Sequence, residues 1–173
     1  HALNQKAVAR LAANELNKSY EQVNLIVCHL GFGITIGAHR KGKIIDVNNG
    51  LHGDGPFSIE RAGTLPIKSL ISLCFSKQYD EGELIELLTF NSGLKAYFNT
   101  ENIDHIFTLL QQLSDEEAKI IKAMTYQINK EIGAMAAVLQ GDVDGIVLTG
   151  VLAEFDVINQ FITERISWIA DVF

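Results

Sequence analysis

The chain has 173 residues, of which 47% are hydrophobic and 20% are charged, a composition typical of a globular protein with one domain or two small ones. Its net charge of −7 argues against generic binding to nucleic acid, whose phosphates an acidic protein repels. No apolar run approaches the roughly 20 residues that cross a bilayer, and no cationic, apolar leader is present, so the sequence predicts a cytoplasmic protein without a membrane partner.

The first predicted elements are a helix and a glycine-containing hairpin. Apolar residues recur at helical spacing over 2–16, and an apolar strand at 24–28 leads into a turn that holds Gly31 and Gly33. An alternating strand, a Lys-Gly turn and a returning strand at 44–47 follow. Glycine lets backbone N–H groups approach an anion, because it has no Cβ and adopts positive φ at little cost. The layout is therefore typical of a phosphate-binding hairpin.

A long loop and a set of helices follow the hairpin. Residues 48–63 are rich in glycine, which predicts a loop, and long loops in compact domains are more often functional than decorative. Ser114 and Glu117 form a capping box that opens a helix running to about residue 139. The other predicted elements are helices over 65–74, 80–88, 102–113 and 155–165, and strands over 143–148 and 167–173.

The order of these elements predicts the fold class. A hairpin-rich sheet, several helices and a closing strand, helix and strand indicate an α/β domain with a mixed β-sheet flanked by helices. The ribonuclease-H-like fold of actin, Hsp70 and sugar kinases has this pattern. Cys28 lies in an apolar strand and Cys74 in an apolar helix, so both are expected to be buried thiols.

Several blocks of sequence resemble one family. The chain is similar to the butyrate kinases, within the acetokinase family, over nearly its whole length. The matching blocks are His29-Leu30-Gly31-x-Gly33, residues 37–42, 45–49 and 53–61, the helical block 127–139, and the opening residues 1–10.

The resemblance implies a two-lobed kinase in which residues 1–173 form the second, nucleotide-binding lobe. An Asn-Pro-Gly-Ser-Thr-Ser loop and an acidic catalytic residue, both expected in the first lobe, are absent from the sequence, as is the usual C-terminal ending of the family. The chain also opens on His1 and stops directly after an apolar stretch. We therefore expect a fragment that does not turn over alone.

The resemblance also assigns the candidate site. His1 matches the histidine that donates to the phosphoryl group in flight, and Arg61 matches the arginine that clamps carboxylate or phosphoryl oxygens. His29 matches the phosphate-binding strand and turn. The remaining candidates are the turn glycines and the nucleotide-side pair, namely Gly31, Gly33, Gly150 and Val151.

Each of these side chains has a plainer alternative interpretation. His1 is an exposed terminal residue, His29 a satisfied core histidine, and Arg61 half of a surface ion pair. His39, near the Lys-Gly turn, is expected to be solvated, and Asn48 to shape the loop through side-chain bonds to the backbone. His52 and His105 have no neighbouring ligand residues in the sequence, so no metal site is expected from them.

The nucleotide side departs from the family pattern. Asn102 and Asp104 stand where an Asp and an Arg usually hold adenine and ribose, and an Arg-to-Asp change reverses a charge. Val151 replaces a glycine, so its side chain crowds the approach of a nucleotide. Within the phosphate turn, Phe32 replaces a small or polar residue.

The resemblance implies transfer of phosphate between ATP and a short-chain carboxylate such as butyrate, giving butanoyl phosphate and ADP, with Mg²⁺ as cofactor. The expected partners are therefore a nucleotide, a fatty acid or acyl phosphate, and a second copy in a homodimer. The alternative is a degenerate lobe that serves as a structural or dimerisation module, which the changes at Asp104 and Val151 motivate.

Overall fold

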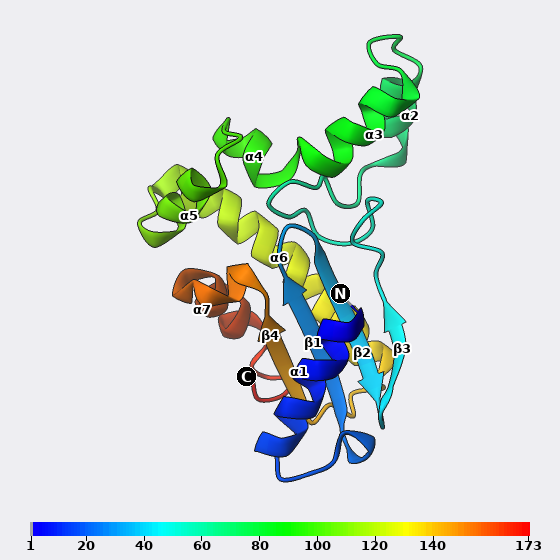
Figure 1. Ribbon diagram of the computed structural model, residues 1–173, viewed down its shortest axis with the longest axis vertical. Helices are drawn as coiled ribbons and strands as arrows, with labels where there is room; N and C mark the ends of the chain where they lie inside the picture. Colours follow the sequence, from blue (N-terminus) through cyan, green and yellow to red (C-terminus); the bar gives the residue numbers. More distant parts are fainter. Residues whose placement is uncertain (1) are drawn as a thin grey trace.

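A four-stranded mixed sheet forms the centre of the computed structural model, which describes residues 2–173 (Figure 1). Its order is β3-β2-β1-β4, with β1 at Asn24–Leu30, β2 at Ile34–Arg40, β3 at Lys43–Val47 and β4 at Gly145–Thr149. The β1–β2 and β2–β3 pairs are antiparallel, whereas β4 runs parallel to β1. The predicted mixed sheet flanked by helices is thus confirmed.

Helix α1, Ala2–Glu15, covers one face of this sheet (Figure 1). Three alanines, Ala9, Ala12 and Ala13, are buried on it and let the helix lie close to Leu25 and Val27 of β1. Alternate residues of a strand point to opposite faces of the sheet. His29 comes two residues after Val27, so its side chain lies on the same face, toward α1. A short 3-10 helix, η1 at Tyr20–Gln22, leads from α1 to β1.

The opposite face carries the main apolar core. Helix α6, Asp115–Val138, and helix α7, Asp156–Ile166, pack there against the other residues of β1, including Ile26 and Cys28. Because both faces of β1 are covered, the strand is a nearly continuous apolar run. Burial of Cys28 is confirmed, and burial in turn raises the pKa of its thiol.

Four helices extend the molecule beyond one end of the sheet (Figure 1). They are α2 at Ile67–Cys74, α3 at Glu81–Phe90, α4 at Gly93–Phe98 and α5 at Ile103–Gln111. Asp80 and Ser114 each accept a backbone N–H three residues on, which starts α3 and α6 as capping boxes. Within the described residues, no helix is both long and apolar enough to cross a membrane.

Three expectations about the elements were wrong. Helix α4 was not expected, since no element was predicted between residues 88 and 102; Gly93, its first residue, adopts φ +61° beside the Ser58 carbonyl. The expected strand over 167–173 is a single bridge between Ile146 and Val172. Cys74 is exposed, because α2 buries none of its residues.

Candidate active site

Two glycines form the turn between β1 and β2, where the N–H of Gly31 donates to the carbonyl of Gly33 at 3.3 Å. Neither residue adopts a positive φ, so the expected use of left-handed backbone at this turn was wrong. A Cβ on Gly31 would instead meet the side chain of His29, and a Cβ on Gly33 that of Arg61. Each glycine therefore leaves room for one side chain, Gly31 for His29 and Gly33 for Arg61.

His29 is the side chain that lies against Gly31. A Cβ on Gly31 would come within 3.0 Å of the His29 Nε2 atom, while the Nδ1 atom lies 3.0 Å from the Oδ1 atom of Asn4 on α1. The ring is half-buried, and burial lowers the pKa of His29 below its ordinary value. His29 is therefore not fully enclosed in the core, although its Nδ1 atom has a partner in Asn4.

Arg61 lies across Gly33. A Cβ on Gly33 would be 1.8 Å from its Nη1 atom, which donates to the Gly50 carbonyl at 2.6 Å. The Arg61 Nε atom is buried and has no hydrogen-bond partner, so this guanidinium keeps a donor for an anion. No ion pair is recorded for Arg61 among the described residues, which argues against the surface ion-pair interpretation.

Ser58 attaches the arginine loop to the glycine turn. This fully buried hydroxyl donates to the carbonyl of Phe32, in the middle of the turn, and accepts the backbone N–H of Arg61 at 3.2 Å. The Phe32 side chain is itself 43% exposed. Replacement of a small residue by Phe32 therefore leaves the backbone of the turn available to the loop.

Asn48 shapes the first part of the loop, as the sequence indicated. Its Oδ1 atom accepts the Ile36 N–H at 2.6 Å, and its Nδ2 atom donates to the carbonyls of Ile34 and Asp54, both at 3.0 Å. A Cβ on Gly55 would lie 2.4 Å from that Nδ2 atom, so the glycine is needed for this contact. These bonds fix residues 48–55 against the start of β2.

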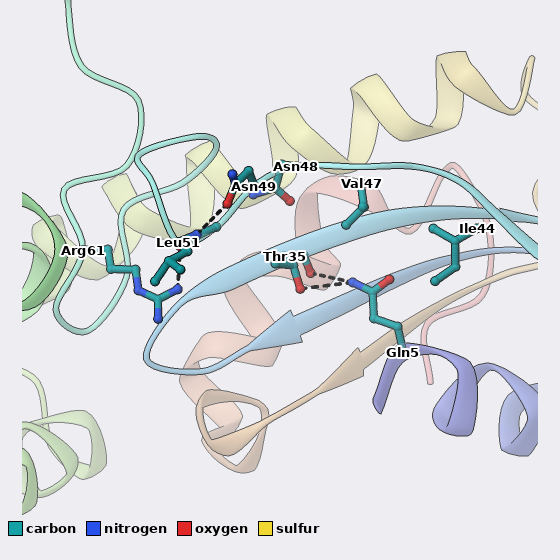
Figure 2. Close-up of a pocket in the computed structure, with 9 residues that line it drawn as sticks. Gln5, Thr35, Ile44, Val47, Asn48, Asn49, Leu51 and Arg61 are labelled. Carbon is teal, nitrogen blue, oxygen red and sulfur yellow. Dashed lines mark hydrogen bonds between the residues drawn. The ribbon is translucent and has the colours of Figure 1, made fainter. Parts of the chain in front are cut away.

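A cavity of about 340 Å³ runs from Arg61 along the edge of the sheet (Figure 2). Arg61 and Leu51 lie at one end, and the apolar side chains of Ile44 and Val47 lie at the other, above Gln5 of α1. The cavity thus joins one cationic group to a largely apolar wall, an arrangement that suits a small carboxylate with a short alkyl chain.

A buried polar chain under this cavity was missed by sequence reasoning. Gln5 Nε2 donates to the Thr35 hydroxyl at 3.1 Å, and Gln5 Oε1 lies 3.0 Å from His39 Nε2. The other ring nitrogen of His39 lies 2.8 Å from the Tyr20 hydroxyl. A Cβ on Gly37 would be 2.3 Å from Gln5 Oε1, so a third glycine admits a side chain here.

The expectation that His39 is solvated was therefore wrong. Its side chain is 0% exposed, because alternation along β2 turns it toward α1 rather than toward the Lys-Gly turn. Burial, with a smaller contribution from the positive charge of Lys6, lowers the pKa of His39 to about 4. The available signal was the sequence itself, since Gln5 is a polar residue among the apolar positions of α1.

Gly150 lies at the end of β4, next to the glycine turn between β1 and β2. It adopts φ +94°, and a Cβ on it would lie 2.6 Å from the carbonyl of Leu30, the residue before the glycine turn. In the sheet, Thr149 pairs with His29. Val151 starts the 3-10 helix η2, Val151–Glu154, and packs partly buried against the main core. Gly150 is thus placed at the turn, while Val151 faces the fold's interior.

Asn102 and Asp104, which the resemblance assigns to the nucleotide side, have structural roles. Asn102 Oδ1 accepts the backbone N–H groups of Asp104 and His105 at 2.9 and 3.3 Å, which caps α5. Asp104 lies in the first turn of α5, where a negative charge is favoured by the helix dipole. Both residues serve to begin the helix.

Two further expectations concern His1 and the Mg²⁺ cofactor. His1 lies outside the described residues, so its predicted role is untested. Among residues 2–173, no three His, Cys, Asp or Glu side chains gather into a possible metal site. Those residues do not fit a Mg²⁺ site by themselves.

Solved structures with the same fold include two carboxylate kinases and a sugar kinase. The acetate kinase of Porphyromonas gingivalis superposes with a TM-score of 0.80 at 23% identity, covering 94% of this chain and 41% of that one. For the propionate kinase of Francisella tularensis subsp. tularensis SCHU S4, the TM-score is 0.79 at 23% identity, with 95% and 42% covered. The ROK hexokinase of Thermus thermophilus gives 0.52 at 12% identity, with 97% and 58% covered.

The chain spans less than half the length of those two carboxylate kinases. The likeness to these structures confirms the fold, with its mixed sheet flanked by helices. A family model described as the acetokinase family matches residues 1–166. With nearly every residue inside that match, the chain belongs to the acetokinase family.

Proposed function

We propose that residues 1–173 form the second lobe of a carboxylate kinase that transfers phosphate between ATP and a short-chain carboxylate, with butyrate as the substrate. The observation that carries the proposal is the placement of Arg61 over Gly33, beside His29 over Gly31. Phosphoryl transfer depends on positioning and on donors that offset negative charge on the transferring group. This turn gathers a guanidinium and an imidazole around one backbone hairpin.

The cavity beside Arg61 supports a substrate larger than acetate. Its volume of about 340 Å³ and its walls of Ile44, Val47 and Leu51 suit an alkyl chain whose carboxylate end faces the guanidinium. Each buried methylene contributes about 0.8 kcal/mol of binding free energy. A four-carbon acid is therefore expected to bind more tightly than acetate at this site.

Roles follow for the other residues. Arg61 would clamp the oxygens of the carboxylate or of the transferring phosphoryl group, and His29 would hold a phosphoryl oxygen near the turn. His1 is proposed as a donor to the group in flight. Gly150 would leave space for the nucleotide at the end of β4, and Mg²⁺ would shield the β- and γ-phosphates of ATP. Because the expected first-lobe motifs are absent, the 173-residue chain is proposed to be inactive alone.

Acyl-phosphate trapping with hydroxylamine tests the proposal. The product of the complete reading frame should form acyl hydroxamate from ATP and butyrate, with a higher kcat/KM for butyrate than for acetate. The 173-residue chain should give no signal above the blank. Product from the short chain, or none from the complete protein with any carboxylate of two to five carbons, would contradict the proposal.

A degenerate lobe remains the second candidate, and the nucleotide side favours it. Asn102 and Asp104 are engaged in starting α5, and Val151 packs into the core rather than leaving bare backbone for a nucleotide. Titration calorimetry of the complete protein with ADP separates the two candidates. Micromolar binding supports the kinase, whereas undetectable binding supports a structural module.

A homodimer is proposed as well. Three helices that extend beyond the sheet carry exposed apolar side chains, namely Ile67 and Ile71 on α2, Phe75 directly after it, Ile85 and Phe90 on α3, and Tyr97 on α4. Exposed apolar surface of this kind is found at protein interfaces. Sedimentation should show a dimer that Ile71→Glu dissociates; a monomer at all concentrations would contradict this.

A further inference from the structure

A separate cavity of about 560 Å³ lies between α6 and α7 and is lined mainly by polar side chains. The residues that line it include Lys122, Tyr126 and Asn129 on α6, and Phe161, Glu164 and Arg165 on α7. Residues three and four positions apart lie on one face of a helix, so one face of each helix contributes to this α6–α7 cavity. Its lining residues differ from those of the cavity beside Arg61.

The α6–α7 cavity contains two cations, Lys122 and Arg165, that have no ion-pair partner among the described residues. The Arg165 guanidinium carbon lies 5.3 Å from the centre of the Tyr126 ring, and the Lys130 ammonium approaches the same ring at 5.8 Å. Lys122 likewise lies 5.2 Å from the centre of the Phe161 ring. Such contacts hold the cations in place without neutralising their charge. In a chain with a net charge of −7, this local group of cations indicates a site for an anion.

The cavity wall also holds two groups that accept hydrogen bonds. Asn129 is 6% exposed and its Nδ2 atom donates to the Phe161 carbonyl at 3.2 Å, but its Oδ1 atom is buried without a partner among the described residues. A buried acceptor without a partner is destabilising, so a ligand that supplies a donor is favoured. The Glu164 carboxylate accepts from Gln160 at 2.7 Å and keeps lone pairs for a further donor.

We propose that the α6–α7 cavity binds a sugar phosphate, a ligand that joins a phosphate group to several hydroxyl groups. A phosphate monoester carries nearly two negative charges at neutral pH, which matches the two cations Lys122 and Arg165 better than one carboxylate does. The planar guanidinium also suits the phosphate oxygens. One sugar hydroxyl would donate to Asn129 Oδ1 and another to the Glu164 carboxylate, whose negative charge disfavours a phosphate without hydroxyl groups. Nothing in this proposal rests on the proposed function.

NMR titration of the nitrogen-15-labelled 173-residue chain with glucose 6-phosphate tests the site. Saturable shifts are expected for the backbone amides of α6 and α7 near Asn129 and Arg165, whereas shifts at residues 31–33 would report binding at the proposed active site. Inorganic phosphate lacks the hydroxyl groups and glucose lacks the charge, so each should bind at α6 and α7 at least about 10-fold more weakly. The proposal is overturned if the amides of α6 and α7 do not shift, or if inorganic phosphate binds there as tightly as glucose 6-phosphate.

Three variants test the assigned contacts. Lys122→Gln and Arg165→Gln each remove one cation from an exposed position, and each should weaken glucose 6-phosphate at least about 10-fold with little change in Tm. Asn129→Ala removes the acceptor, so it should weaken glucose 6-phosphate but leave the affinity for inorganic phosphate unchanged. An equal loss for both ligands in Asn129→Ala would contradict a hydrogen bond from the sugar.

Lys119→Gln is the matched control. Lys119 is an exposed lysine of the same helix that pairs with Glu116 at 2.5 Å and does not line the cavity. Its replacement changes the net charge by the same amount as Lys122→Gln and should leave the affinity for glucose 6-phosphate unchanged. The proposal is overturned if Arg165→Gln binds as tightly as the unmodified chain, or if Lys119→Gln loses as much affinity as Arg165→Gln.

Discussion

The phosphoryl side of the molecule, residues 29–33 with Arg61 and the start of α1, differs from the nucleotide side, residues 102–104 with Gly150 and Val151. On the phosphoryl side, the glycines give space to the side chains that would act on a ligand. On the nucleotide side, Asn102 and Asp104 begin α5, and Val151 packs into the core. Asn102, Asp104 and Val151 thus serve the fold itself, whereas Gly31 and Gly33 leave room for side chains that could bind a ligand.

The first prediction concerns the attachment of α1 to the phosphoryl side. Burial holds the pKa of His39 at about 4, against about 6.5 in an unfolded chain. The unfolded state then binds more protons between these values, so the free energy of unfolding falls by up to about 3 kcal/mol as pH drops from about 6.5 to about 4. Urea denaturation at several pH values measures it.

His39→Gln removes the titrating group and should flatten this part of the profile relative to the unmodified protein. His52→Gln is the control, because His52 is an exposed histidine in the loop and its replacement should leave the profile unchanged. Equal profiles for the His39 variant and the unmodified protein would show that the buried chain does not depend on a neutral ring.

The second prediction tests whether Gly33 is needed to position Arg61 rather than to stabilise the fold. In Gly33→Ala, the new Cβ would meet the end of the flexible Arg61 side chain at 1.8 Å, so the guanidinium moves while the backbone stays. We expect a loss of about 100-fold in acyl-phosphate formation by the complete protein, since a misplaced clamp costs about that much, with little change in Tm.

Gly133→Ala is the matched control. Nothing lies within 4 Å of an added Cβ on this helical glycine, so activity should be unchanged and the helix stabilised by roughly 0.5–1 kcal/mol. Equal activity of the Gly33 and Gly133 variants would show that the position of the Arg61 guanidinium does not depend on the absence of a Cβ at residue 33.

The third prediction is that replacing Gly150, unlike replacing Gly33, lowers the stability of the fold. Its φ of +94° and the Leu30 carbonyl at 2.6 Å leave no room for a Cβ, and the obstacle is backbone. Gly150→Ala should therefore lower the free energy of unfolding by about 2 kcal/mol, measured by urea denaturation. An unchanged stability would mean that the β4 end is less constrained than the geometry implies.

The smallest expected effect is on the nucleotide side. Asn102→Ala removes the cap of α5 and should cost about 1 kcal/mol of stability, whereas Asn102→Ser keeps a capping oxygen and should cost much less. Titration calorimetry should give the same affinity for ADP in both variants. A lower affinity in the Ser variant would assign Asn102 a direct contact with the nucleotide.

Local patterns were enough to predict most of the fold. The apolar run of β1, the alternation of β2, the capping box at Ser114 and the helical spacing of apolar residues in α1 are each signals that lie within a short stretch of sequence. Helix α4 escaped because Gly93 starts it through contacts with the Ser58 backbone, which lies far away in the sequence. The last strand is one bridge because only residues 171–173 pair with β4, through backbone hydrogen bonds to Ile146 and Leu148.

The candidate site was predicted in part. Gly31 and Gly33 were predicted from the glycine-containing hairpin, and the family resemblance identified His29 and Arg61; the contacts of these four residues fit a phosphate site. The support from α1 was missed, since Asn4 and Gln5 are ordinary helical residues until the fold brings them to His29 and His39. Polar contacts between distant segments leave no periodic pattern in the sequence.

The central claim is that Arg61, held over Gly33 beside His29, forms a phosphate cradle. Calorimetry of the 173-residue chain with inorganic phosphate tests it most directly, with Arg61→Ala and Arg61→Lys compared with the unmodified chain. Phosphate should bind saturably to the unmodified chain, at least about 10-fold more weakly to Arg61→Ala and with a smaller loss to Arg61→Lys, with no change in Tm. Phosphate affinity that is the same in all three proteins would contradict it.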